Sequence, residues 1–248
     1  MKIAPDVYLV GGGPFNGFGL TNDMDSHIYA LDGGNEIALI DCGMATKDSI
    51  EKIFNNLEND GLDPQKIKHI FITHYHIDHC GGLSKWQELL DFDSYISVDA
   101  AAAIESGDTD STGFALAQSQ GIYPSDYVFK AAKVTKPLKP GDQITVGSLK
   151  IEFFLTPGHC NGHSTYLVTG ISKYLFTGDC VFANGNIALL NTKDSNIEKY
   201  RETIFNLERL NFEAMLPGHG SLVLSDGPKH LKIAADSFRT LLLPRNFV

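Results

Sequence analysis

Short runs of apolar residues recur along this chain and predict buried β-strands. The run over residues 68–73, Lys-His-Ile-Phe-Ile-Thr, is rich in the β-branched and aromatic side chains that favour a pleated sheet. Glycine, proline and asparagine separate such runs, and Asp-Gly-Gly-Asn at 32–35 is typical of a hairpin turn. The predicted strands cover residues 7–10, 26–31, 36–40, 68–73, 95–98, 143–146, 149–155, 164–168, 174–176 and 213–216.

Other segments carry apolar residues at the spacing of a helix that packs on one face. In residues 48–59, Ile50, Ile53 and Leu57 recur at this spacing. Ser195 and Glu198 predict a capping box near the start of a later helix. The predicted helices cover residues 48–59, 84–90, 194–210 and 228–243. A strand, a helix and a second strand in succession predict an α/β fold.

Four candidate metal ligands stand within six residues, directly after the strand 68–73: His74, His76, Asp78 and His79. A helical zinc motif spaces its histidines four apart, whereas these stand at i, i+2 and i+5 on a predicted loop. Alternate residues of an extended backbone point to opposite sides, so one ion cannot easily collect all four. His74 and His76 are expected to serve one ion. Asp78 and His79 then serve a second, which predicts a two-metal site.

Three further candidates follow predicted strands in the second half of the chain: His159, Asp179 and His219. The two halves echo each other, because the apolar run before His74 has a counterpart before His159. The segment that ends near Asp41 likewise has a counterpart that ends near Asp179. This echo indicates two packed sheets with helices outside.

Composition narrows the classes of partner. A chain of 248 residues with 43% hydrophobic residues can bury a sizeable core. A net charge of −10 and a pI near 5.3 oppose binding to a phosphate backbone. No apolar run approaches the roughly 20 residues that span a bilayer, and the amino terminus lacks a signal-peptide pattern. We therefore expect a cytoplasmic protein with a small-molecule substrate and neither a nucleic-acid nor a membrane partner.

The four cysteines show no CxxC spacing, so neither a zinc knuckle nor a disulfide framework is predicted. Each directly follows a candidate site residue. We expect them to pack as small, semi-apolar residues in tight turns. The alternative is a layer of soft thiols that makes the site sensitive to oxidation. The cysteines are Cys42, Cys80, Cys160 and Cys180.

Taken in order, the motifs HYHIDH, TPGH, TGD and LPGHG resemble those of the metallo-β-lactamase superfamily. The resemblance spans nearly the whole chain and includes all seven ligand positions of its dinuclear members. It implies an αββα sandwich, here a single domain of residues 1–248, with the site at one edge of the two sheets. It also implies that Asp41 contacts and orients a metal ligand without binding the metal itself. The implied ligands are His74, His76 and His159 on the first metal, Asp78, His79 and His219 on the second, and Asp179 as a bridge.

Such a pair of metals carries a definite chemistry. Two divalent ions about 3.5–4 Å apart hold a bridging water and lower its pKa towards roughly 7, which provides a hydroxide for attack on an acyl carbon. Asp78 is the expected catalytic carboxylate, because it can orient this nucleophile and shuttle its proton. Zinc is the expected metal. Iron and manganese are alternatives, since imidazole and carboxylate ligands suit all three.

Differences between this chain and particular branches of the superfamily limit the reactions that we expect. True β-lactamases carry Cys or Ser where this chain has Asp179, so antibiotic hydrolysis is not expected. Glutathione-thioester hydrolases add a helical carboxy-terminal region, whereas few residues follow His219 here. The resemblance therefore favours a hydrolase of a small ester, thioester or lactone. The alternatives are a persulfide dioxygenase with one iron and, opposed by the negative charge, a phosphodiesterase or nuclease.

Residues 99–140 lose the regular pattern and are predicted to form an insertion that caps the site. Phe114, Tyr123 and Tyr127 are its candidate pocket residues. The alternative is that these aromatics only pack the insertion onto the sandwich or form a contact in a homodimer.

Two further histidines, His27 and His163, lie outside the predicted ligand set. His163 is expected to hydrogen-bond a neighbouring loop, with support of a metal ligand as the alternative. His27, which follows the glycine-rich segment 11–20, is a candidate for the substrate pocket.

Overall fold

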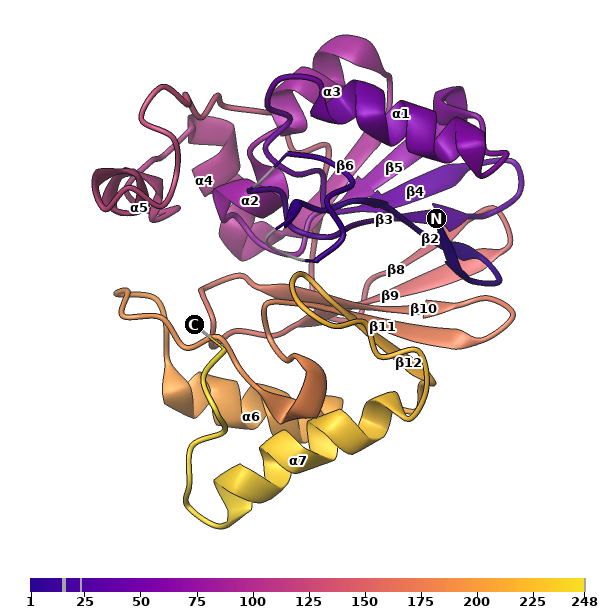
Figure 1. Cartoon of the computed structure of the whole chain (residues 1–248). Coiled ribbons are helices and arrows are strands. Elements are labelled where there is room, and N and C mark those ends of the chain that lie inside the picture. Colours follow the sequence, from indigo (N-terminus) through magenta and orange to yellow (C-terminus); the bar gives the residue numbers. More distant parts are fainter. Residues whose placement is uncertain (15–16, 23, 248) are drawn as a thin grey trace.

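A computed structural model describes residues 1–14, 17–22 and 24–247 and shows four layers: helices, sheet, sheet and helices (Figure 1). The predicted αββα sandwich is confirmed. In the described residues the first sheet has seven strands in chain order. They are β1 (Lys2–Ala4), β2 (Val7–Gly11), β3 (Ile28–Asp32), β4 (Ile37–Ile40), β5 (Ile67–Phe71), β6 (Asp93–Ser97) and β7 (Lys136–Leu138).

The second sheet is built from the later part of the chain. In the described residues its order is β12-β11-β10-β9-β8. The strands are β8 (Gln143–Val146), β9 (Leu149–Leu155), β10 (Ser164–Thr169), β11 (Lys173–Gly178) and β12 (Ala214–Pro217).

Helices cover the outer face of each sheet. In Figure 1, α1 and α3 lie over the first sheet, α6 and α7 lie under the second, and α4 and α5 lie at one end. The α-helices are α1 (Ser49–Asn59), α2 (Ile77–Cys80), α3 (Leu83–Leu89), α4 (Val98–Ser106), α5 (Phe114–Ser119), α6 (Ile197–Leu207) and α7 (Gly227–Arg239). Within the described part of the chain, η2 (Pro64–Lys66) and η3 (Ala183–Gly185) are 3₁₀ turns. No helix among the described residues is long and apolar enough to cross a membrane.

Three apolar layers hold the four layers of secondary structure together. Alternation along β3 shows how the sequence builds them: Ile28 and Ala30 pack under the first helices, whereas Tyr29 and Leu31 pack between the sheets. A third cluster joins the second sheet to α6 and α7. Each sheet is thus buried on both faces, which is why its strands read as nearly continuous apolar runs.

Strand direction brings the candidate ligands to one edge. β4, β5 and β6 are parallel neighbours, and so are β11 and β12. Because β9 and β11 both run antiparallel to β10, they point the same way. The segments that carry candidate ligands follow the carboxyl ends of β5, β9, β11 and β12. Carboxyl ends of parallel strands are where α/β proteins place their sites.

The structure corrects several local predictions. The capping box is wrong: Asn196 caps α6 by accepting a hydrogen bond from the amide of Lys199, whereas Ser195 bonds the amide of Leu190 and the carbonyl of Gly158. The last helix ends at Arg239 rather than at residue 243. An Asn side chain caps a helix as well as Ser does, so sequence alone did not separate the two positions.

The insertion is also more regular than predicted. Residues 99–140 contain most of α4, all of α5 and the short strand β7, which pairs with β6. The histidine segment is not wholly a loop, because its last residues form the single turn α2. A three-residue strand that contains Pro137 carries too little pattern to be recognised in a sequence.

Candidate metal centre

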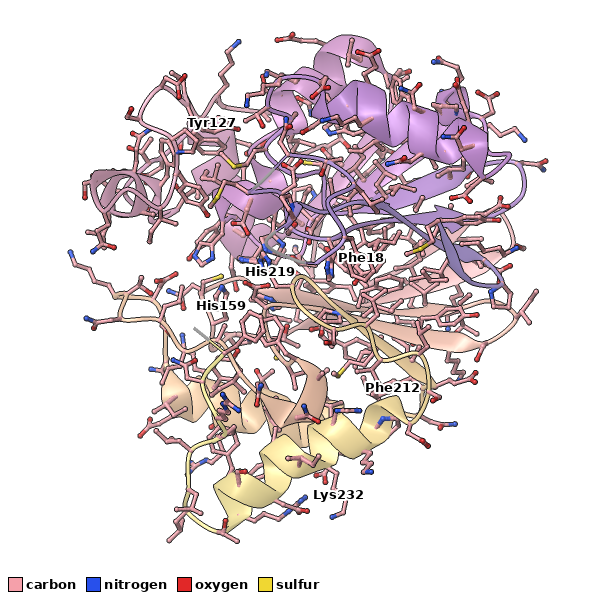
Figure 2. All side chains as sticks on the ribbon, in the orientation of Figure 1. Phe18, Tyr127, His159, Phe212, His219 and Lys232 are labelled. Atoms are coloured by element: carbon pink, nitrogen blue, oxygen red, sulfur yellow. The ribbon has the colours of Figure 1, made fainter. Side chains whose placement is uncertain are left out.

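Seven side chains from both halves of the molecule converge at this edge. They form three overlapping groups, in each of which the ligand atoms lie within 4.8 Å of one another. His159 and His219 both lie where the two sheets face each other (Figure 2). The groups are His74, His76 and His159; His74, His79 and Asp179; and Asp78, His79 and His219. All seven predicted ligands are therefore brought together.

The first group, called here the imidazole group, consists of His74, His76 and His159. Nδ1 of His76 lies 3.0 Å from Nε2 of His74 and 2.9 Å from Nε2 of His159. In a tetrahedral site with metal–nitrogen bonds of about 2.0–2.1 Å, neighbouring ligand atoms lie about 3.3–3.4 Å apart. The spacing therefore suits three ligands of one ion with little rearrangement.

The second group, called here the mixed group, consists of Asp78, His79 and His219. Oδ2 of Asp78 lies 3.0 Å from Nε2 of His219 and 3.4 Å from Nε2 of His79. The two imidazole Nε2 atoms are 3.2 Å apart. The turn α2 begins after His76 and directs Asp78 and His79 to this second position, which separates the two groups.

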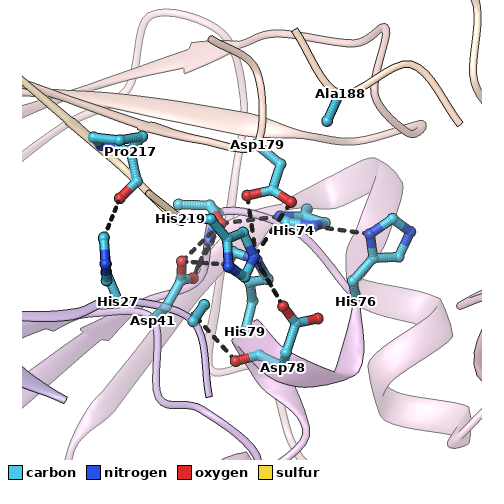
Figure 3. Close-up of polar contacts among 12 residues, drawn as sticks. His27, Asp41, His74, His76, Asp78, His79, Asp179, Ala188, Pro217 and His219 are labelled. Carbon is cyan, nitrogen blue, oxygen red and sulfur yellow. Dashed lines mark hydrogen bonds and ion pairs between the residues drawn. The ribbon is translucent and has the colours of Figure 1, made fainter. Parts of the chain in front are cut away.

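Asp179 lies between the two groups (Figure 3). Its Oδ1 is 3.4 Å from His79 Nε2, and its Oδ2 is 3.7 Å from His159 Nε2 and 3.5 Å from His219 Nε2. Oδ1 is buried and makes no hydrogen bond with any described residue. A buried carboxylate oxygen without a donor is costly, so a cation fits here. A Cβ at Gly218 would lie 2.6 Å from this oxygen, which explains the glycine.

The imidazole group and the mixed group differ in charge. In the imidazole group, burial lowers the pKa of each histidine because a charged imidazole loses its hydration. Neighbouring imidazoles add to this effect, and the pKa of His76 falls to about 3. The three rings are therefore neutral near pH 7, which is the form that binds a metal.

In the mixed group and Asp179, neighbouring charges outweigh the effect of burial on the pKa values. Burial opposes the ionisation of Asp78 and Asp179, but the facing imidazoles outweigh it and hold the pKa of both carboxyls below its usual range. Burial also disfavours protonation of His79 and His219, yet the carboxylates raise the pKa of both rings. This part of the centre therefore binds positive charge, either as protons or as a metal ion.

Polar partners behind the candidate ligands fix their orientation. Asp41 is buried, accepts a hydrogen bond from the amide of Thr73 at 2.7 Å and lies 2.8 Å from Nδ1 of His79, so Nε2 of that ring faces the centre. The carbonyl of Ala188 lies 2.7 Å from Nδ1 of His159 and orients that ring. His163 accepts a hydrogen bond at 3.1 Å from the amide of Asp179. Asp41 thus contacts the candidate ligand His79, and His163 contacts the backbone of the candidate ligand Asp179.

The candidate pocket residues are placed differently from one another. His27 is fully buried, and its Nδ1 lies 3.1 Å from the carbonyl of Pro217, just before His219 (Figure 3). Phe114 is buried, and Tyr127 donates a hydrogen bond to the carbonyl of Met44. Tyr123 alone of these four reaches a candidate ligand, because its hydroxyl donates to Oδ1 of Asp78 at 2.7 Å.

An open cleft of about 990 Å³ begins beside His76. Sequence reasoning missed the loop 191–194 that forms one wall. Tyr75 donates a hydrogen bond to Asp194 of this loop and so ties the loop to the histidine segment. A tyrosine between two ligands was the available signal, but its partner is 119 residues away in sequence.

The four cysteines are free and buried. Burial raises the pKa of each thiol, so all four are protonated at neutral pH. This arrangement favours the packing role, because a buried neutral thiol is a weak nucleophile and a weak metal ligand.

A sequence profile described as the metallo-beta-lactamase superfamily matches residues 21–219, which include all seven candidate ligands. The chain belongs to this superfamily. Its members are mostly metal-dependent hydrolases, and the cluster of histidines and aspartates fits a metal site of that kind.

Curated relatives in the superfamily are distant. The chain is 27% identical over 153 residues to the probable metallo-hydrolase YybB of Bacillus subtilis, covering 62% of this chain and 60% of that protein. It is 28% identical over 167 residues to a hydroxyacylglutathione hydrolase of Buchnera aphidicola, covering 65% and 49%. The lactamase-like protein nscB of Aspergillus fumigatus is 23% identical over 229 residues, covering 91% and 56%. The chain thus spans about half to three fifths of the length of these relatives.

Solved structures of superfamily members share the fold. The metallo-beta-lactamase FEZ-1 from Legionella gormanii superposes with a TM-score of 0.72 at 20% identity, covering 97% of this chain and 94% of that chain. A Cronobacter sakazakii metallo-beta-lactamase with a HARLDQ motif gives a TM-score of 0.72 at 19% identity, covering 97% and 95%. At this level of identity the likeness concerns the fold.

Proposed function

We propose that this chain is a hydrolase that uses two divalent metal ions, with zinc as the expected metal, to cleave a small ester, thioester or lactone. The observation that carries the proposal is the convergence of seven ligand side chains at one edge, with the bridging position taken by Asp179. A single tetrahedral ion needs about four ligands, so seven suit a pair.

Each side chain has a role in this proposal. The imidazole group would hold one ion, the mixed group the other, and Asp179 both. When bound, such ions polarise an acyl oxygen and activate a water molecule at neutral pH. Asp78 would orient the attacking water with Oδ2, the oxygen that faces the centre, and would take up the water's proton there and pass it to the leaving group. Asp41 keeps the Nε2 of His79 directed at the centre.

The cleft supports an uncharged acyl substrate. Of the described residues that line it, Asp99, Asp108, Asp110 and Asp194 are acidic, and Lys193 is the one basic residue. This lining disfavours glutathione thioesters and phosphodiesters, which are anionic. Leu116 and two alanines of α4 provide apolar surface for an acyl chain.

We also propose that the chain acts as a single domain in the cytoplasm, without a nucleic-acid or membrane partner. The net charge of −10 argues against a nucleic-acid partner, because a negatively charged protein repels a phosphate backbone.

The test is metal analysis of protein purified without oxygen, combined with turnover assays. The panel contains esters, thioesters and lactones of matched acyl groups, a phosphodiester, a glutathione thioester and a glutathione persulfide. We expect about two metals per chain and hydrolysis of the uncharged acyl substrates. One iron per chain with oxygen uptake on the persulfide would contradict the proposal and indicate a dioxygenase. Turnover of only the phosphodiester would contradict the acyl substrate class.

A further inference from the structure

One side chain of the insertion reaches the metal centre. The hydroxyl of Tyr123 donates a hydrogen bond to Oδ1 of Asp78, while Oδ2 of the same carboxylate faces His79 and His219. Tyr123 therefore contacts the outer oxygen of one candidate ligand.

The position of Tyr123 is set by packing within the insertion. Its ring lies 5.9 Å, centroid to centroid, from that of Phe114, which is buried in the core beneath the first-half helices. The Gln118 side chain donates to the carbonyls of Pro124 and Tyr127 and closes the turn after Tyr123. Because α5 and this turn form one packed unit, the insertion holds Tyr123 against the apolar core of the first half.

We propose that Tyr123 is a positioning residue of the metal centre: its hydroxyl holds Asp78 so that one carboxylate oxygen faces His79 and His219, the other members of the mixed group. This inference rests on the proposed function, because it requires a metal at that group. A carboxylate free to rotate can present either oxygen, or both, to a metal. A hydrogen bond to the outer oxygen restricts it to one, and such partners of metal ligands commonly affect affinity and activity. The insertion thus contributes to metal binding as well as to the cleft wall.

The test compares two hydroxyls of the same insertion. Tyr123→Phe removes the bond to Asp78 and keeps the ring packed on Phe114. Tyr127→Phe is the matched control, because it removes a hydroxyl bonded to the carbonyl of Met44. Metal-free wild type and both variants are titrated with Zn²⁺ against a chelating dye and with Co²⁺ by absorption spectroscopy. Thermal unfolding of the metal-free proteins monitors the fold.

We expect Tyr123→Phe to weaken binding of one of the two metal equivalents by about 10–100-fold and to change the Co²⁺ spectrum. Tyr127→Phe should bind both equivalents as the wild type does. In an Asp78→Ala background, Tyr123→Phe should have no further effect, since the alanine already lacks the carboxylate that the hydroxyl holds.

Three outcomes would overturn the inference. Unchanged metal binding by Tyr123→Phe would exclude the role while leaving the two-metal hydrolase in place. Equal losses in Tyr123→Phe and Tyr127→Phe would show that the hydroxyls act only through the packing of the insertion. Failure of the wild type to bind a second metal would refute the proposed function itself, and the inference with it.

Discussion

The imidazole group and the mixed group lie at the same edge but carry different charge. His74, His76 and His159 are buried, and their pKa is lowered, so this group is neutral. The mixed group and Asp179 place two carboxylates against two imidazoles whose pKa is raised. The first group can accept a metal without releasing protons. The second would release protons on binding a metal.

Their supports differ in the same way. A backbone carbonyl orients His159, whereas the carboxylate of Asp41 orients His79. Helix α2 and the insertion, through Tyr123, fix Asp78. The difference teaches that neutral groups, a backbone carbonyl and a hydroxyl, support the neutral imidazole group, whereas a carboxylate and a phenol support the charged mixed group. We therefore expect mutations of these supports to act mainly on the mixed group.

The largest effect is expected for Asp179→Ser, because Asp179 faces both groups. Mutation of a side chain behind a ligand costs about 10–100-fold in affinity or activity, so loss of a carboxylate shared by two sites should lower kcat/KM by more than about a hundredfold. Metal content should fall as well. Inductively coupled plasma analysis and the acyl-substrate assay measure both. Asp236→Ser, on the outer face of α7, is the control, and full metal content in Asp179→Ser would refute the bridging role.

A smaller and more selective effect is expected for Asp41→Asn. The change removes the negative charge behind His79 while it keeps a hydrogen-bonding side chain of the same size. One metal equivalent should bind about 10–100-fold more weakly, and the other should be unaffected. Stepwise Zn²⁺ titration distinguishes the two. Equal weakening of both equivalents would remove the distinction between the groups.

The pH dependence of the metal-free protein should reveal both groups. His79 and His219 have a raised pKa, so the stability they contribute is present below about 6.5 and is lost as the pH rises through their folded-state pKa. The imidazole group has a lowered pKa, so stability is lost as the pH falls below 6.5, where the unfolded chain binds the protons.

The unfolding temperature of the metal-free protein should therefore be highest near pH 6.5. It should fall on either side, by about 2–4 °C for each 1 kcal/mol of lost unfolding free energy. Added Zn²⁺ should abolish the loss on the alkaline side, because the metal replaces the protons of the mixed group. A metal-free unfolding temperature that stays constant from pH 6.5 to 8.5 would contradict this assignment of charge.

The smallest effect is expected for Thr73→Val. The Thr73 hydroxyl contacts Asp41 at 2.9 Å and His74 at 3.0 Å, so it touches a support of the mixed group and a ligand of the imidazole group. Asp41 keeps its bond from the Thr73 amide in the variant, and we expect less than about a tenfold change in either metal affinity. Thr73→Ser retains the hydroxyl and serves as the control. A loss larger than that of Asp41→Asn would contradict the ranking.

The sequence predicted the sandwich and all seven residues that the structure brings together, because short-range patterns determine both. Strand runs such as 149–155 have clear boundaries, and the order of ligand motifs is characteristic of the superfamily. The direction of each strand then places the residue that follows it at one edge. Asp41 carries the same signal, since it directly follows the strand β4.

The rest depends on contacts between distant segments. Phe114, Tyr123 and Tyr127 are equivalent in sequence as aromatic residues of an insertion, yet only Tyr123 contacts a candidate ligand. The bond between Tyr75 and Asp194 joins segments that no local pattern relates. Burial of His27 likewise follows from the packing of neighbouring strands, which composition does not reveal.

The division of ligands along the chain has a consequence for how the protein assembles. Each of the three ligand groups takes two side chains from the part before residue 140 and one from the part after it. The exposed turn at 139–142 joins the two parts. If the backbone were cut in this turn, neither fragment would hold a complete group, and tight metal uptake would require both. The metal centre would then report reassociation of the fragments, as the reconstituted signal of a split reporter does.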